Sequence, residues 1–510
     1  MLQIAVITAA VLLFITSIAA RWGKTSSNVK INRLPGAQLP KGSWSLPWIG
    51  ETIAFYSQGP YKFYSQHIAR YGRIFRTHLM GNPTIVTSTP EAARFVLATR
   101  HKSFPAFYSP SVSRLLSINP SAAVSQEMPP GKILKTIHDS MHFELLRDKI
   151  AKIDRITRWV LSSWDKQPFV VTYQEAKKLA FHAVLDSIAG MAPSPETMKL
   201  MDDFGYVIKG MGTSMPFNIP GTSYHMALEK GQQVFEALSP VVKKRRLEKS
   251  QEKCTLDLLM EIENANGEKI SDDSLQSHLC GLMFAGFHSS AVLFVWLVKF
   301  LGENQEILQQ VKVSALKSHL FSKLHIMHQK FITIVIVLYS TCSQAEQDTI
   351  RMGKISPEDP LSWTDIINMP LTSTVFQETL RMASIVPFLT RRAKEDINYE
   401  GIQIPKSWLV HVGIQNFHLG PEYHKDPLKF DPSRFQAPAK PAAFLPFGNG
   451  ASMCPGRELV KFEALVFVHY LVTTYSWERI GSEQGIDHWP IPTVKGGLPI
   501  KVAKLNECVT

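Results

Sequence analysis

The chain has 510 residues, of which 45% are hydrophobic, so it can bury a large core within a single domain. Five scattered cysteines exclude a disulfide framework and a paired CxxC zinc site, and they fit reduced thiols in a cytosol-facing compartment. The formal net charge of +12 comes without a concentrated Lys/Arg tract, so nucleic-acid binding is not expected. An acidic protein partner, an anionic membrane surface and a merely solvated basic surface all remain open.

The N-terminal segment 2–20 carries no charged residue, and Arg21, Lys24 and Lys30 follow it. About 20 apolar residues span a bilayer core as a helix, and flanking positive charge tends to stay cytosolic. Residues 1–24 therefore predict a single-pass membrane anchor with the rest of the chain in the cytosol. The alternative is a cleaved signal peptide, which we disfavour because the positive charges follow the apolar run instead of preceding it.

A stretch rich in Pro and Gly follows at residues 25–50. Proline fixes φ and cannot continue a helix, so the stretch predicts a stiff hinge; an ordinary loop without an orienting role is the alternative. From residue 51 to residue 510 there is no second long linker and no repeat, and most segments have helical periodicity. We expect one mainly α-helical domain with a minor β-sheet region that includes strands at 84–87 and 408–412.

The longest predicted helix runs from residue 272 to residue 301, with Ser271 as a plausible N-cap. Its apolar middle is interrupted by small and polar residues, namely Ala285, Gly286, His288 and Ser289. Histidine and serine side chains can carry and donate protons near neutral pH. The alternative is that both polar side chains only satisfy the helix interior.

A glycine-rich loop at residues 444–457 presents Cys454 ahead of an apolar-periodic run at 459–470. Glycines allow positive φ and close approach of the backbone to a flat ligand, and backbone N–H groups aimed at a sulfur stabilise a thiolate. An axial thiolate pushes electron density onto haem iron and favours O–O cleavage. A lone cysteine outside such a pattern is more often a small buried hydrophobe.

This loop resembles the cysteine-ligand loop of the cytochromes P450. The matching residues are Phe447, Gly448, Gly450, Cys454 and Gly456. The resemblance implies a cytochrome P450 fold that binds haem b (iron protoporphyrin IX) through the axial thiolate of Cys454. One departure is Ser452, which stands where the family commonly has a basic residue that contacts a haem propionate. Another donor would have to compensate for it.

The resemblance also implies cationic contacts to the haem propionates. Arg391 matches a strand arginine that pairs with a propionate in the family, and its neighbour Arg392 is a second candidate. A solvated surface cation is the alternative. On the helix expected to supply another basic contact the family pattern has drifted, and Lys135 and His138 stand as the candidates, although neither gives the two-pronged fit of arginine.

Glu378 and Arg381 have an i, i+3 spacing, which places a carboxylate and a guanidinium on one face of a helix. Alone, such a pair is usually a solvated surface pair that contributes little. Downstream, however, the segment 430–435 resembles the P450 segment whose arginine, here Arg434, joins the pair in a buried network. The resemblance therefore implies that these three residues lock the fold behind the haem.

The family resemblance gives roles to the middle of the 272–301 helix. In the family a small-residue pair, here Ala285 and Gly286, opens the helix beside the iron. An acid–alcohol pair then helps to relay protons to bound dioxygen. His288 replaces the acid here and Ser289 the usual threonine, and both can still move protons, so monooxygenation is expected to remain feasible.

Within the superfamily the body is most similar to plant enzymes that hydroxylate isoprenoid hormones, in particular abscisic acid 8'-hydroxylases. The matching stretches are 48–53, 90–97, 220–225 and 378–385. The resemblance implies a monooxygenase of the endoplasmic reticulum membrane that hydroxylates a lipophilic terpenoid or hormone-like molecule with dioxygen and electrons from NADPH-cytochrome P450 reductase. Brassinosteroids, gibberellin precursors and strigolactones are related substrates. The alternatives are a reductase-independent haem-thiolate isomerase or dehydratase, and an inactive remnant.

The segment 313–344 fits neither the family pattern nor an amphipathic helix. Its removal restores an uninterrupted helix on which Ile307, Val311 and Ile350 share one face. We hypothesise that the segment is a translated intron or a wrongly assigned exon. A genuine surface insertion and a second membrane-dipping element are the alternatives, although its apolar run is too short to span a bilayer as a helix.

Overall fold

The computed structural model describes ten stretches of the chain. They are residues 33–43, 50–115, 130–213, 216–248, 252–264, 266–313, 350, 359–436, 443–482 and 485–505. The predicted membrane anchor and nearly all of the segment 313–344 lie outside them. The chain divides into two compact units, although residues 51–510 were expected to form one domain. The smaller is built from the described parts of Met1–Phe107, Phe388–Asn416 and Asn449–Ala451, and the larger from those of Tyr108–Pro387, Phe417–Gly448 and Ser452–Thr510.

The smaller unit is organised around a four-stranded sheet. In spatial order its strands are β1 (Ile74–Leu79), β2 (Asn82–Thr87), β7 (Leu409–Val412) and β4 (Leu389–Arg392). β2 pairs with β7 in parallel, and the other two pairings are antiparallel. The unit also contains α2 (Thr52–Gln58), α3 (Pro60–Tyr71), α4 (Pro90–Arg94), the π-helix η1 (Phe95–Thr99) and the hairpin of β5 (Ile397–Tyr399) and β6 (Ile402–Ile404). The strands predicted at 84–87 and 408–412 are confirmed as parts of β2 and β7.

The described part of the predicted hinge is attached to this smaller unit. Gln38 forms a bridge with Ile402 and Gly42 one with Arg76, both in parallel. A Cβ atom at Gly42 would lie 1.9 Å from the carbonyl oxygen of Arg76, so only glycine allows this close approach. The described part of the hinge is therefore paired at Gln38 with β6 and at Gly42 with β1.

The larger unit is mainly α-helical. Its helices are α5 (Pro110–Leu115), α7 (Pro130–Ser140), α8 (Phe143–Arg147), α9 (Ile150–Leu161), α10 (Thr172–Ala189), α11 (Pro195–Met211), α12 (Ser223–Leu247), α13 (Thr255–Met260), α14 (Asp272–Glu303), α15 (Gln305–Val313), α19 (Trp363–Ile367), α20 (Pro370–Ala383) and α22 (Arg457–Thr474), while α21 (Ile414–His418) contributes to both units. Its strands are β3 (Val170–Val171), β8 (Tyr475–Arg479) and β11 (Pro499–Lys504) in one sheet and β9 (Ile486–Asp487) with β10 (Thr493–Val494) in another.

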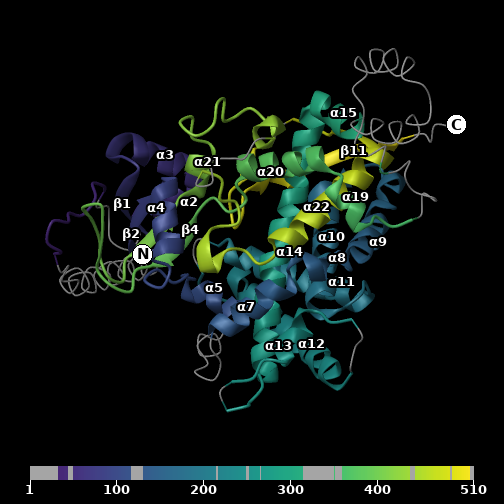
Figure 1. Cartoon of the computed structure of the whole chain (residues 1–510), viewed down its shortest axis with the longest axis horizontal. Helices are drawn as coiled ribbons and strands as arrows, with labels where there is room; N and C mark the ends of the chain where they lie inside the picture. The colour runs from purple at the N-terminus through teal and green to yellow at the C-terminus, as the bar shows by residue number, and fades with distance from the viewer. Residues whose placement is uncertain are drawn as a thin grey trace, which may run out of the picture. The chain divides into compact units, whose positions relative to one another are not determined.

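The long helix α14 is the centre of this unit and packs against α10, α12, α20 and α22 (Figure 1). It begins as predicted, because the Ser271 hydroxyl accepts a hydrogen bond from the Ser274 backbone N–H. Among the described residues α14 is also the helix long and apolar enough to cross a membrane, but 67% of its most apolar stretch is buried inside the protein. α14 is therefore a core helix.

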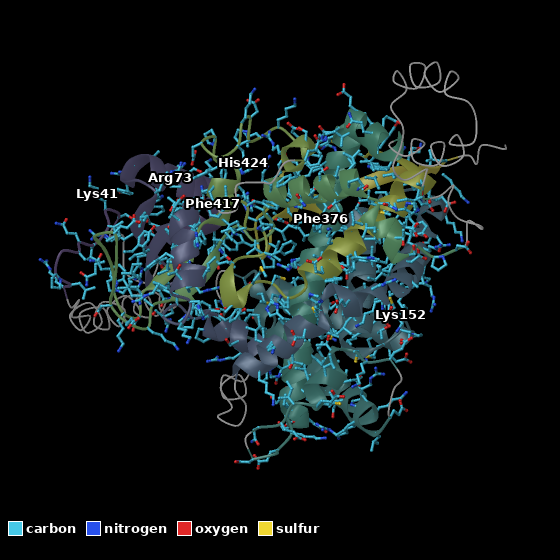
Figure 2. The ribbon with its side chains drawn as sticks, viewed as in Figure 1. Lys41, Arg73, Lys152, Phe376, Phe417 and His424 are labelled. Carbon is cyan, nitrogen blue, oxygen red and sulfur yellow. The ribbon has the colours of Figure 1, made fainter. Side chains whose placement is uncertain are left out.

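Side chains sort by polarity within the larger unit. Figure 2 shows Phe376 inside it and Lys152 towards its margin. Phe376 is 4% exposed and belongs to a core that unites α9, α10, α14, α20 and α22. The mainly α-helical fold with a minor sheet component is thus confirmed for the described residues. This packing fixes the position of the loop that precedes α22.

Candidate active site

The cysteine loop is held by short-range backbone hydrogen bonds. The Gly448 N–H donates to the Leu445 carbonyl at 3.1 Å, and the Cys454 N–H donates to the Phe447 carbonyl at 2.9 Å. Phe447 is half-buried, and its ring stacks on Phe376 of α20 with a centroid distance of 6.4 Å. The backbone of the loop is therefore ordered up to the residue that carries the thiol.

Two glycines of the loop adopt conformations that other residues rarely take. Gly448 has φ +75° and Gly450 has φ +74°. A Cβ at Gly450 would also lie 2.5 Å from the Leu97 carbonyl oxygen and 2.8 Å from Cα of Ala98, both in η1. Gly456 differs, because a Cβ there would meet Cys454 Sγ only at 4.0 Å. Gly448 and Gly450 are thus required by geometry, whereas Gly456 has room for a methyl group.

The Cys454 side chain is exposed, and α22 begins three residues after it. Protein atoms around the other sides of the sulfur raise the pKa of the thiol. The backbone N–H of Gly456 and the charge of Arg457 offset only part of this rise, because both stabilise a thiolate. Donors aimed at an accessible sulfur are what a thiolate ligand to a metal requires.

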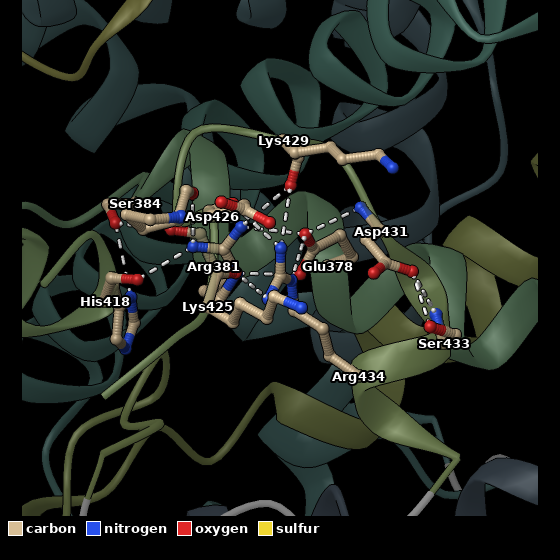
Figure 3. Close-up of polar contacts among 11 residues, drawn as sticks. Glu378, Arg381, Ser384, His418, Lys425, Asp426, Lys429, Asp431, Ser433 and Arg434 are labelled. Atoms are coloured by element: carbon tan, nitrogen blue, oxygen red, sulfur yellow. Dashed lines mark hydrogen bonds and ion pairs between the residues drawn. The ribbon is translucent and has the colours of Figure 1, made fainter. Parts of the chain in front are cut away.

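The three residues predicted to form a network do meet (Figure 3). Glu378 and Arg381 are fully buried and share a bidentate pair, with Nε to Oε2 at 2.7 Å and Nη2 to Oε1 at 2.8 Å. Arg434 Nε adds a contact to the same carboxylate at 3.3 Å. Arg381 also donates through Nη1 to the carbonyls of His418 and Pro427, each at 2.8 Å. The arrangement ties α20 to the segment that leads to the cysteine loop.

The small pair on α14 splits between two faces of the helix. Ala285 is exposed, and the half-buried Ser289 one turn later donates its hydroxyl to the Ala285 carbonyl at 2.7 Å. Gly286 instead faces α10, where a Cβ would lie 2.8 Å from Cγ2 of Val184. Gly286 thus permits close packing of α10 on α14, and only Ala285 contributes to the exposed strip.

His288, like Gly286, contacts α10. It is 3% exposed, its Nδ1 lies 3.0 Å from the Tyr173 hydroxyl of α10, and its Nε2 is buried without a hydrogen-bond partner among the described residues. Burial, helped by the charge of Lys177, lowers the pKa of His288 to about 4. The ring is therefore neutral at pH 7.

The candidates for propionate contacts differ in their surroundings. Arg391 on β4 is 7% exposed and donates to the Thr390 carbonyl. Arg392 points the other way, as neighbours on a strand do, and its guanidinium lies 4.2 Å from the ring centroid of Phe107. Lys135 is exposed and His138 half-buried one turn apart on α7. Arg391 is therefore not a solvated surface cation, and Arg392 stacks on an aromatic ring.

Sequence reasoning missed Glu463 on α22. It is fully buried, and burial raises its pKa to about 8, which the Ser290 hydroxyl of α14 opposes only in part. Neither carboxyl oxygen has a hydrogen bond of normal geometry within the described stretches. The sequence pattern could have indicated this burial, because Glu463 follows Leu459 by four residues and so lies on the apolar face of the helix.

The residues present fit a haem group. The exposed sulfur of Cys454 lies in the loop just before α22, the exposed strip at Ala285 and Ser289 lies on α14, and α14 packs against α22 within the same unit. Small side chains on α14 leave room for a flat ring, and the N–H of Gly456 supports a thiolate. The fold and this cysteine loop together define a haem-thiolate protein.

Comparison with known proteins identifies the family. The cytochrome P450 family profile matches residues 40–314 and 343–504, so the chain belongs to the cytochrome P450 family. It is 36% identical to abscisic acid 8'-hydroxylase 4 of Arabidopsis thaliana, covering 91% of this chain and 92% of that protein. An abscisic acid 8'-hydroxylase of Solanum lycopersicum is 34% identical, with 92% and 91% covered. The chain is thus a P450 monooxygenase, with haem ligated by a cysteine thiolate as the family implies.

Solved structures give the same fold. A retinoic acid-bound cyanobacterial P450, CYP120A1, superposes with a TM-score of 0.76 at 25% sequence identity and covers 92% of this chain and 100% of that one. The haem domain of cytochrome P450DA reaches a TM-score of 0.74 at 15% identity, with 92% and 98% covered, which supports the fold alone.

Proposed function

We propose that this protein hydroxylates a lipophilic terpenoid or hormone-like substrate, with abscisic acid as the first candidate. The observation that carries the proposal is the match to abscisic acid 8'-hydroxylases over nine tenths of both chains. The solved relative that binds retinoic acid supports the same ligand class, because retinoic acid is also an isoprenoid acid. Brassinosteroids, gibberellin precursors and strigolactones remain the related candidates.

Cys454 would hold the haem iron, and Arg391, Lys135 and His138 would pair with its propionates. When bound, haem supplies dioxygen activation, which an axial thiolate promotes. The residues of the loop keep the Cys454 backbone fixed through its N–H bond to Phe447. Gly448 and Gly450 fit because their positive φ values let the backbone pass close to a flat group.

His288 and Ser289 would move protons to the reacting oxygen. The Ser289 hydroxyl stays on the exposed strip of α14, and its oxygen keeps a lone pair that can accept a proton donor. His288 lines a pocket of about 660 Å³ formed by α10, α11, α14 and the β9–β10 hairpin. Because burial lowers its pKa to about 4, the ring does not store a proton at pH 7, and it would relay one only when a group that enters the pocket pairs with Nε2.

Electrons would come from NADPH-cytochrome P450 reductase, whose acidic face suits the net charge of +12. The apolar N-terminal segment supports attachment to the endoplasmic reticulum membrane with the catalytic part in the cytosol. The neutral His288 favours a second candidate, a reductase-independent isomerase or dehydratase, because such reactions need no proton delivery to dioxygen.

The test is incubation of the full chain in microsomes with reductase, NADPH and abscisic acid under ¹⁸O₂. We expect a hydroxylated product that carries one ¹⁸O atom and that disappears without reductase or in Cys454→Ala. A product that forms without reductase and without ¹⁸O would establish the isomerase or dehydratase. Haem-loaded protein that converts neither abscisic acid nor the related hormones would refute the proposal.

A second variant addresses the proton route. His288→Leu should reduce product formed per NADPH consumed by roughly tenfold or more while leaving haem binding unchanged, because a proton-transfer group is lost away from the cysteine. Tyr173→Phe removes the partner of Nδ1 but keeps the ring, so it should lower the yield as well if the proton passes through Tyr173. Unchanged product yield in His288→Leu would show that the histidine only fills the helix interior.

We also propose that residues 313–344 are a translated intron. The P450 profile stops at residue 314 and resumes at 343, which supports an insertion at this place. Val311 and Ile350 are both buried in the same core, with Ile307 packed against it, as the rejoined helix requires. Sequencing of transcripts across the junction tests the idea. A dominant transcript that encodes the segment would contradict it, and haem content of the full chain would then show whether the protein is an inactive remnant.

A further inference from the structure

We propose that His418 is a positioning residue that couples the buried Arg381 network to the start of the cysteine loop and thereby sets the geometry at Cys454. The inference rests on Cys454 as the haem ligand and does not depend on the substrate. His418 lies at the end of α21, is fully buried, and does not belong to any motif that sequence reasoning singled out.

The hydrogen bonds of His418 determine its tautomer. Its Nε2 lies 3.0 Å from the backbone nitrogen of Leu445, which can only donate, so Nε2 is an acceptor. The proton of the neutral ring is therefore on Nδ1, which lies 3.2 Å from the Ser384 hydroxyl oxygen. The Ser384 hydroxyl in turn donates to the Arg381 carbonyl at 2.8 Å. Each ring nitrogen thus has one partner of the right kind.

The same residue closes a loop of contacts through its backbone. Arg381 donates to the His418 carbonyl at 2.8 Å, and Figure 3 shows Ser384 and His418 side by side next to the Arg381 guanidinium. Ser384 holds this place as the left-handed C-cap of α20, with φ +40°. His418 therefore contacts the network at two points, one through its ring and one through its carbonyl.

From His418 a short path leads to the thiol. The Leu445 N–H donates to Nε2 of His418, and the Leu445 carbonyl accepts a hydrogen bond from the Gly448 N–H. Two residues after Leu445, the Phe447 carbonyl accepts a hydrogen bond from the Cys454 N–H. Burial, with the nearby charges of His424 and Arg381, lowers the pKa of His418 to about 3. Nε2 thus stays an acceptor at all pH values at which the enzyme works.

Two amide variants separate the two ring contacts. His418→Gln keeps an acceptor at the position of Nε2 and loses the donor at Nδ1, whereas His418→Asn keeps polar atoms near Nδ1 and cannot reach Leu445. Ser384→Ala is the control, because it removes the Nδ1 partner and leaves the Nε2 contact. If His418 acts through Leu445, only His418→Asn should disturb the cysteine loop.

The readouts are the ferrous–CO spectrum and amide hydrogen exchange of the full chain. We expect the red-shifted thiolate band in the wild type, in His418→Gln and in Ser384→Ala, and a partial loss of this band in His418→Asn. In His418→Asn the Leu445 amide should also exchange roughly tenfold faster, because one hydrogen bond is lost. A thiolate band and Leu445 exchange in His418→Asn equal to the wild type would overturn the proposal.

A measurement on the wild type alone covers the case in which His418→Asn does not fold. The Leu445 amide should exchange as slowly as the Asp431 amide, which donates to Glu378 at 2.9 Å, because both open only with the network. Fast, independent exchange at Leu445 would refute the coupling. If the protein binds haem but makes no hydroxylated product, the proposed function fails while this inference stands.

Discussion

Two buried polar regions of the larger unit differ in how fully their hydrogen bonds are satisfied. In the network behind the cysteine loop, the five N–H groups of Arg381 have five acceptors within the described residues. At the contact of α14 with α10 and α22, by contrast, His288 Nε2 and both carboxyl oxygens of Glu463 have no hydrogen bond of normal geometry there. Satisfied networks fix one conformation, whereas unsatisfied groups cost stability and are retained where function uses them.

The strongest test of this contrast is Arg381→Lys. Lysine cannot make the bidentate contact to Glu378 or reach the three carbonyls that Arg381 serves, so about 3–5 kcal/mol of unfolding free energy should be lost. Thermal unfolding and haem content measure the effect. Arg434→Lys is the comparison, because Arg434 is 13% exposed and contacts Glu378 at the longer distance of 3.3 Å. Equal losses of unfolding free energy in both variants would show that the burial of the Glu378–Arg381 pair does not determine the size of the loss.

Glu463→Gln tests the unsatisfied region. The folded-state pKa of about 8 lies above the ordinary value of 4.5, so wild-type stability should fall as pH rises through this window, by up to roughly 1.4 kcal/mol per pH unit. The neutral glutamine should remove that slope. Denaturant unfolding at pH 5 and pH 7 measures it, and a variant that is no more stable than the wild type at pH 7 would contradict a buried, unpartnered carboxyl.

Gly286→Ala gives the smallest of the three effects. The added methyl meets the stiff side chain of Val184, which should cost about 1–3 kcal/mol, partly offset by the better helix propensity of alanine. Gly281→Ala on the same helix is the control, because a Cβ there has no neighbour within 4 Å and should stabilise slightly. Adding Val184→Ala to Gly286→Ala should restore the lost unfolding free energy. If Gly286→Ala and Gly281→Ala change the unfolding free energy alike, α10 and α14 do not pack as closely as described.

Sequence patterns predicted the parts of the site that depend on local spacing. The long helix with its Ser271 cap, the helix after Cys454 and the Glu378–Arg381 pair follow from periodicity and i, i+3 spacing. The family resemblance added Arg434. The split of Ala285 from Gly286 and the His418 contacts could not be predicted, because they depend on which neighbouring element each face meets. The neutral state of His288 depends on burial that one sequence does not reveal.

The most direct test of the central claim is the ferrous–CO spectrum of the full chain beside a form that lacks residues 313–344. A red-shifted thiolate band that is present in at least one of the two forms and lost in Cys454→Ala is the predicted result, because a satisfied network holds this cysteine as the haem ligand. Absence of that band from both forms, when each is folded and supplied with haem, would contradict the account.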